Sequence, residues 1–175
     1  SLQFIQQEMN NITALSNETC QLGIQSRNMV FYIAKKDSPQ PIRLMSSVGK
    51  QLPLYCTGLG RALLAYKSEE EIRSLFPEVL TAYTPHTIAT INDLLKELEL
   101  TRQRGYAVEH EETNLMVNCI AVSLDYNNAP IAALSISIPT FRISESKEKE
   151  AVQILWEAKQ RIETHFKMYG VDFGN

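Results

Sequence analysis

Two stretches of the chain contain residue types that could bind a small molecule. In the first, a loop that starts at Gly49 leads into a short buried helix expected over residues 58–66. The first N–H groups of a helix have no intrahelical partner and carry partial positive charge, so they attract carboxylates and phosphates. Gly58 and Gly60 leave these groups unshielded. Glycines also permit a tight turn and close packing, and the spacing alone favours this second interpretation.

The second stretch runs from Gly105 to Glu112 and is followed by Cys119, Ser135 and Ser137. Alternation along a strand places Ser135 and Ser137 on one face. Two hydroxyls among alanines, leucine and isoleucines are unusual for an apolar core, and they suggest hydrogen bonds kept for a buried polar ligand. Neighbouring carbonyl groups could equally accept these bonds, and the sequence does not decide between the two interpretations.

Groups for catalysis or for a metal are scarce. Cys119 lies in an apolar strand, where a thiol is more often a small hydrophobic group than a nucleophile. His110 is its only plausible base. The run from Glu109 to Glu112 is expected to be mostly an exposed charged turn, from which one carboxylate could point inward. Paired His-Cys spacings and a GxSxG motif are absent. The sequence therefore predicts no enzyme, no metal and no cofactor.

Composition narrows the class of protein. Among 175 residues, 17 Lys and Arg stand against 20 Asp and Glu, and no basic cluster suited to DNA phosphates occurs. Three cysteines without a CxxC pair indicate a reducing compartment. With no signal peptide and no membrane-spanning run, a cytoplasmic protein is expected. The first residue, Ser1, suggests a fragment of a protein that extends further at its N-terminus.

Periodicity predicts an α+β fold, with a mainly antiparallel sheet of about six strands and flanking helices, of the GAF or profilin type. The terminal helices are expected to pack on one face. Apolar positions on the first helix (Leu2, Ile5 and Met9) suggest a partner surface. Helices are predicted over 2–17, 58–66, 68–77, 91–105 and 144–168, and strands over 19–25, 29–35, 42–48, 106–110, 117–124 and 130–138.

These segments, in this order, resemble the effector-binding domain of the IclR family, over nearly the whole chain. The resemblance is carried by residues 49–65 (GKQLPLYCTGLGRALLA), 104–107 (RGYA), Glu111-Glu112 before Cys119-Ile120-Ala121, and residues 133–137 (ALSIS). It implies a single effector-binding domain over 1–175. Its helix over 2–17 would lead from a winged helix-turn-helix domain that is absent here. It further implies dimers or tetramers, DNA contact only through the absent domain, and a small organic or sugar acid as effector.

The resemblance also implies which residues form the pocket. The effector would contact the Gly58 and Leu59 N–H groups, with the remaining polar contacts coming from the sheet. The polar set is Glu109, Cys119, Ser135 and Ser137, and the pocket wall is Leu44, Leu52, Met116 and Val117.

The chain departs from the family pattern in places. Met116 stands where Gly is usual, Glu109 is one methylene longer than the Asp of some members, and Arg61 replaces the commoner Lys with little expected effect. Three alternatives stay open: a small enzyme using Cys119 or Glu109, a zinc site using Cys119, Glu109 or His110, and an interaction module without a ligand.

Overall fold

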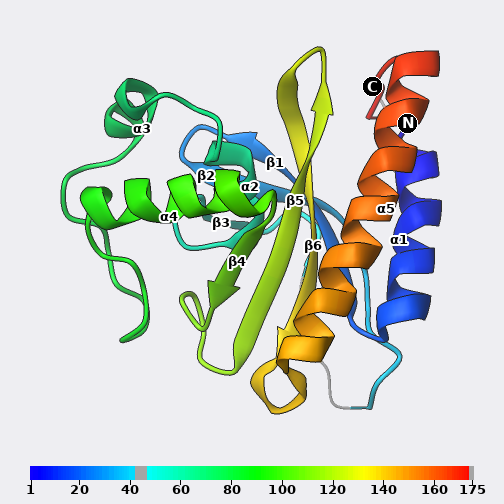
Figure 1. The fold of residues 1–175 in the computed structure, drawn as a ribbon, viewed down its shortest axis with the longest axis horizontal. Helices are drawn as coiled ribbons and strands as arrows, with labels where there is room; N and C mark the ends of the chain where they lie inside the picture. Colours follow the sequence, from blue (N-terminus) through cyan, green and yellow to red (C-terminus); the bar gives the residue numbers. More distant parts are fainter. Residues whose placement is uncertain (42–46, 174–175) are drawn as a thin grey trace.

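The computed structural model describes residues 1–41 and 47–173, in which six strands form one sheet between two groups of helices (Figure 1). The strands follow the order β3-β2-β1-β6-β5-β4, and each neighbouring pair is antiparallel. The predicted α+β class with a mainly antiparallel sheet is therefore confirmed. The strands are β1 (Thr19–Ser26), β2 (Met29–Lys36), β3 (Gln51–Pro53), β4 (Ala107–His110), β5 (Val117–Tyr126) and β6 (Ala129–Pro139).

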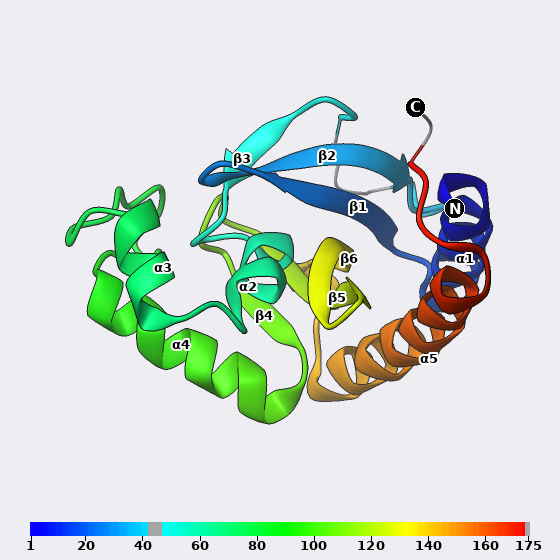
Figure 2. The ribbon, with the colours of Figure 1, turned by 90° about the horizontal axis from the view of Figure 1, so that it is seen from above.

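Helices α1 (Leu2–Ser16) and α5 (Glu145–Tyr169) lie side by side on one face of the sheet, as predicted (Figure 2). Asn17 ends α1 in the left-handed conformation, and its N–H donates to the Thr13 carbonyl. The apolar faces of the two helices and alternate residues of β5 and β6 form a first hydrophobic core.

Two of the three α1 side chains that suggest a partner surface, Ile5 and Met9, are buried within the chain, and Leu2 is partly buried. Ile5 is 0% exposed and Met9 is 1% exposed, because both pack into the first core against α5 and the sheet. Amphipathic spacing identifies an apolar face, but it does not say whether that face meets the same chain or another one.

The opposite face of the sheet carries α2 (Gly58–Leu64), α3 (Glu69–Leu75) and α4 (Ile91–Arg104), which enclose a second hydrophobic core. Sequence signals predict helix starts at Ser68 and Thr90 and a helix end at Gly105, and the structure confirms them. Ser68 and Glu71 form a capping box, the Thr90 side chain accepts from Asp93 N, and Gly105 ends α4 at φ 83°. The sheet thus separates two cores, and neighbouring residues of one strand, such as Ile120 and Ala121 of β5, belong to different cores.

The strand predicted over Ile42–Val48 falls mostly on residues 42–46, which lie outside the described residues. Of the rest, Ser47 and Val48 belong to no strand. Strand β3 pairs with β2 within the segment that the sequence predicts to be the loop starting at Gly49. No helix in the described residues is long and apolar enough to cross a membrane.

Candidate ligand-binding site

A cavity of about 90 Å³ lies between the start of α2 and the sheet face that carries the second core. Most of the residues predicted to form a pocket line it, although they come from five elements, β3, α2, β4, β5 and β6. Leu44 lies outside the described residues, and Met116 does not line the cavity. The predicted residues that line it are Leu52, Gly58, Leu59, Glu109, Val117, Cys119, Ser135 and Ser137.

The start of α2 reaches the cavity because its glycines let the backbone approach the sheet. A Cβ added to Gly58 would lie 3.1 Å from the Cys119 Cβ, and one added to Gly60 would lie 2.0 Å from the Leu54 carbonyl oxygen. The packing role that the spacing favours is therefore real. The Thr57 side chain caps the helix by accepting from Gly60 N. Among the described residues, no group accepts from the N–H of Gly58 or Leu59, and both residues line the cavity.

The sheet supplies a buried polar wall opposite this helix. The Ser135 and Ser137 hydroxyls donate to the Gln21 side-chain oxygen, at 3.0 and 2.6 Å, and the Cys119 Sγ lies 3.2 Å from the Ser137 Oγ. The strand register produces this alignment, because Gln21 pairs with Ser135 and Cys119 pairs with Ser137. The hydroxyls are thus satisfied by a side chain, which neither earlier interpretation anticipated.

Gln21 is a site residue that the sequence alone does not single out. Its signal is a polar side chain in a strand where Cys20 and Leu22 are fully buried. Finding it from sequence would require knowing that β1 lies in the middle of the sheet, where both faces are covered.

Glu109 points inward from β4 and is 1% exposed. Burial raises the pKa of its carboxyl to about 7, although the hydrogen bond from Glu112 N and the nearby Arg61 both lower it. Near neutral pH this carboxyl is therefore partly protonated, and a cavity with a neutral carboxyl does not repel an anion. Glu109 is thus the carboxylate of this run that the resemblance places inside. Glu112 is buried as well, so the exposed turn predicted over Glu109–Glu112 is wrong for Glu112, whereas His110 is exposed.

Arg61 has a larger structural role than expected for an arginine that stands in place of the commoner lysine. Its side chain is 1% exposed and donates in three directions, to the Tyr55 carbonyl at 3.0 Å, to the Val108 carbonyl at 2.9 Å and to the Glu112 carboxylate. Glu112 Oε1 also accepts from Ile88 N at 2.9 Å. A lysine has one nitrogen and cannot match this planar set of donors. Arg61 therefore connects α2, β4 and the loop that lines the cavity beyond Glu112.

Met116 lies in the loop before β5 and is not among the residues that line the cavity. Its φ is 72°, in the left-handed region that favours glycine, and its side chain is 49% exposed. The Met116 N–H donates to Glu111 Oε2 at 2.7 Å, and its carbonyl accepts from Thr140 N at 3.0 Å. These two bonds hold the backbone in place, and the cavity lining does not include Met116 although the resemblance assigns it to the pocket wall.

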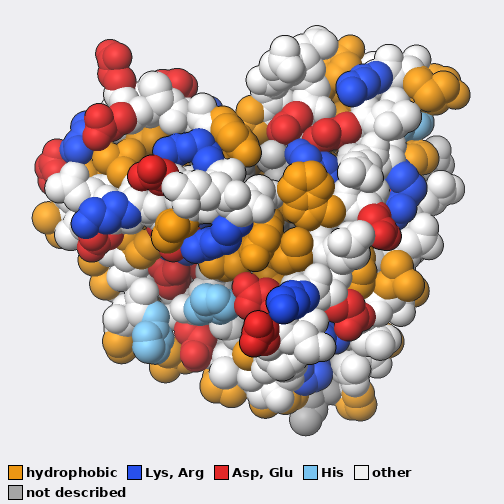
Figure 3. Space-filling view, viewed as in Figure 1, with side chains coloured by type: hydrophobic (Ala, Val, Ile, Leu, Met, Phe, Trp, Pro, Cys, Tyr) orange, Lys and Arg blue, Asp and Glu red, His pale blue; other side chains and the backbone are white. Residues whose placement is uncertain are grey.

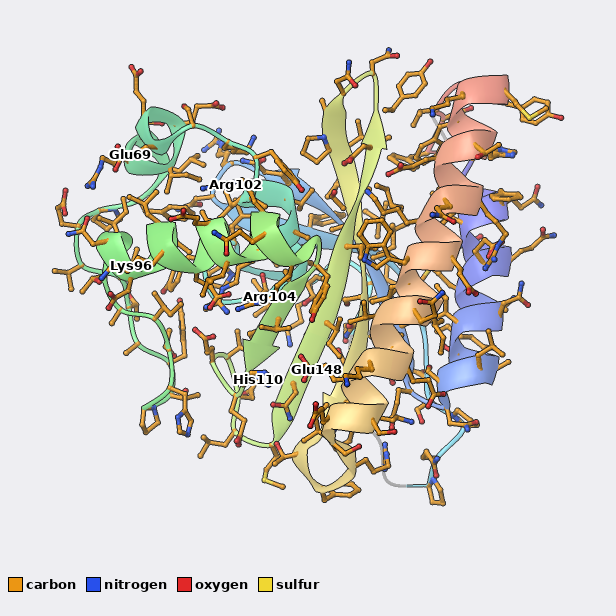
Figure 4. The ribbon with its side chains drawn as sticks, viewed as in Figure 1. Glu69, Lys96, Arg102, Arg104, His110 and Glu148 are labelled. Carbon is orange, nitrogen blue, oxygen red and sulfur yellow. The ribbon has the colours of Figure 1, made fainter. Side chains whose placement is uncertain are left out.

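The groups needed for an enzyme or a zinc site are not assembled. Burial raises the pKa of the Cys119 thiol well above its ordinary value, and its hydrogen-bond neighbour is a hydroxyl. His110 lies at the outer end of β4, where its Nδ1 is 3.1 Å from Asn118 Oδ1 (Figure 4). Within residues 1–41 and 47–173, no three His, Cys, Asp or Glu side chains are grouped so as to hold a metal ion.

Charge on the surface is mixed. On the face shown in Figure 3, Lys and Arg side chains are interspersed with Asp and Glu and do not gather into a stripe. This agrees with the absence of a basic cluster in the sequence.

Comparison with known proteins gives consistent matches. Residues 2–164 match the family described as "Bacterial transcriptional regulator IclR C-terminal". The chain is 38% identical to the transcriptional regulator KdgR of Dickeya chrysanthemi, over 89% of this chain and 52% of that protein. It is 33% identical to the transcriptional repressor AllR of Escherichia coli K12, over 89% of this chain and 58% of that protein. These relatives are regulators and not enzymes, and the chain spans little more than half of their length.

A solved structure matches in the same way. The crystal structure of the C-terminal domain of E. coli KdgR superimposes with a TM-score of 0.85 at 32% identity, covering 97% of this chain and 98% of that one. The likeness therefore extends over the complete fold, including the strands that line the cavity.

Proposed function

The chain belongs to the IclR family of bacterial transcriptional regulators, as their C-terminal domain, and we propose that it is a sensor that binds a small organic or sugar acid in the cavity beside α2. In the complete regulator, ligand binding would change how a separate N-terminal domain binds DNA. The domain itself would not contact DNA, and it would act as a dimer or tetramer.

One observation carries this proposal: buried polar groups converge on an open space in an otherwise apolar core. Gln21, Glu109, Ser135 and Ser137 are each at most 7% exposed, and all four line the cavity with the free N–H groups of Gly58 and Leu59. Buried polar groups are costly unless they have partners. A carboxylate would accept from the open donors, and each charge-assisted hydrogen bond would contribute roughly 1.5–3 kcal/mol.

The charge balance of the site also favours an anion. Glu109 is partly protonated near pH 7, so it repels a bound carboxylate less than a fully ionised glutamate would. Lys50 lies at the exposed side of the cavity and would attract an anion from solution.

A screen of small carboxylic acids tests the proposal, with thermal stability and NMR chemical shifts of cavity residues as readouts. We expect at least one hydroxy, oxo or sugar acid to raise the melting temperature and to shift the Gly58 and Leu59 amide signals. The double variant Ser135→Ala/Ser137→Ala should weaken binding of that acid by about tenfold or more, because it removes the two hydroxyls that hold the Gln21 side chain in the cavity wall. A folded domain that binds no acid of the panel would favour the interaction module without a ligand.

A further inference from the structure

We propose that Gln21 is a ligand-binding residue that selects acids with an oxygen atom in addition to the carboxylate. The inference rests on the proposed function, because it assigns a role within the same cavity. It also changes the role of Ser135 and Ser137, which become positioning residues for the Gln21 amide.

The strand pattern of β1 directs Gln21 toward the cavity. Its neighbours Cys20 and Leu22 are 0% exposed and pack into the first core, on the side of α1 and α5. Side chains alternate along a strand, so Gln21 lies on the opposite side, where it lines the cavity and is 7% exposed. The amide is therefore enclosed.

Hydrogen-bond lengths fix which end of the amide meets the serines. The contact with Ser137 Oγ is 2.6 Å long, which is typical of O–H···O bonds and shorter than the usual N–H···O range of about 2.7–3.2 Å. The hydroxyls of Ser135 and Ser137 therefore both donate to Gln21 Oε1. This leaves Nε2 pointing away from the serines.

The Gln21 Nε2 group has two N–H donors and no acceptor in the part of the chain that the structure describes. Its nitrogen is not among the fully enclosed side-chain atoms without a partner, so it borders open space, and the open space beside Gln21 is the cavity. A buried NH₂ group without an acceptor is unfavourable, and an oxygen atom of a ligand would supply one.

This arrangement predicts chemical selectivity. An amide N–H donates to a hydroxyl or keto oxygen but gains nothing from a methyl group in the same place. Lactate and isobutyrate test the difference, because both are small carboxylates that differ only in a hydroxyl or a methyl group on the carbon beside the carboxylate. The cavity should bind lactate about tenfold more tightly than isobutyrate, as expected when a buried donor is otherwise left unpaired.

The experiment titrates both acids into the wild-type domain and into Gln21→Met, followed by NMR chemical shifts. Methionine keeps the size of the side chain and removes the donors. We expect Gln21→Met to bind the two acids with similar affinity and to keep its affinity for isobutyrate. The control is Gln25→Met on the same strand, where the amide donates to the Arg27 carbonyl, and it should keep the preference for lactate.

Each result supports or overturns the inference. An unchanged preference in Gln21→Met, an equal loss of both acids, or no preference in the wild type would show that Gln21 is only structural, while the proposed function would stand. If neither these acids nor any other carboxylate binds the wild type, the proposed function fails and this inference fails with it. Should Gln21→Met not fold, the NMR signals of the Gln21 side-chain NH₂ group in the wild type keep the test open: they must shift on binding lactate and not on binding isobutyrate.

Discussion

The Arg61 guanidinium bonds to two backbone carbonyls and to the Glu112 carboxylate, so three segments around the cavity meet at one side chain. Replacing it with lysine keeps the charge but leaves at least one buried carbonyl without a donor. We expect Arg61→Lys to lower the free energy of unfolding by about 2–4 kcal/mol. Urea denaturation measures this change.

The matched control is Arg73→Lys in α3, where the arginine pairs with Glu69 and Glu78 on the exposed surface. Exposed pairs contribute little, so this variant should change stability by less than about 0.5 kcal/mol. Equal effects of the two replacements would show that the Arg61 network is dispensable.

Glu109 should make stability depend on pH. Its pKa is about 7 in the folded chain and 4.5 as a free group, so the folded state holds a proton that the unfolded state releases between these values. Stability therefore falls as pH rises from about 4.5 to 7, and the full cost of roughly 3 kcal/mol is present above pH 7. Two charged groups act on this carboxyl: Arg61 lowers its pKa and Glu112 raises it, so their effects partly cancel.

Glu109→Gln removes this titration and can still accept from Glu112 N. We expect the variant to be more stable than the wild type at pH 8 and equal to it at pH 4, with melting temperature measured across this range. A stability difference that does not change with pH would mean that Glu109 does not hold its proton.

At the scale of single elements, two glycines at helix ends differ in what an added side chain would meet. Gly105 ends α4 in the left-handed conformation, at φ 83° and ψ 10°, and an added Cβ would lie 2.8 Å from the Trp156 ring. Gly170 follows α5 at φ 75° and ψ −173°, a conformation that is essentially restricted to glycine, and an added Cβ would meet nothing within 4 Å. Both alanine variants should therefore lower the free energy of unfolding by about 1–3 kcal/mol for the backbone. Only Gly105→Ala should also change the tryptophan fluorescence of the folded protein, and an unchanged fluorescence in that variant would contradict the contact with Trp156.

Local sequence chemistry predicts most element boundaries, because caps and turns act within a few residues. Thr90 marks the start of α4 and Gly105 marks its end. The left-handed residues Asn127 and Asn128 form the turn between β5 and β6. The site is different, because Gln21 meets Ser135 and Ser137 only through the register of β1 against β6. Such a contact joins residues more than 110 positions apart, and no short motif encodes it.

For the whole molecule, the relation between the two cores decides how ligand binding can reach α1. The cavity lies on the α2 side of the sheet, whereas α1 packs on the other side, so the two have no direct contact through the cavity lining. Strand β1 belongs to both sides, since Gln21 faces the cavity while Cys20 and Leu22 pack in the first core. A shared central sheet makes it costly to unfold one core and keep the other.

Hydrogen exchange tests whether the two cores unfold together. A ligand at ten times its Kd stabilises the folded state by RT ln 11, which is about 1.4 kcal/mol, and slows globally exchanging amides about elevenfold. If the domain is one cooperative unit, the slowest amides of α1 should slow as much as those of β5, although α1 does not touch the ligand. Slowing confined to α2, β4 and β5 would mean that the cores open separately, and that a signal from the cavity would need another route to the N-terminal end of the chain.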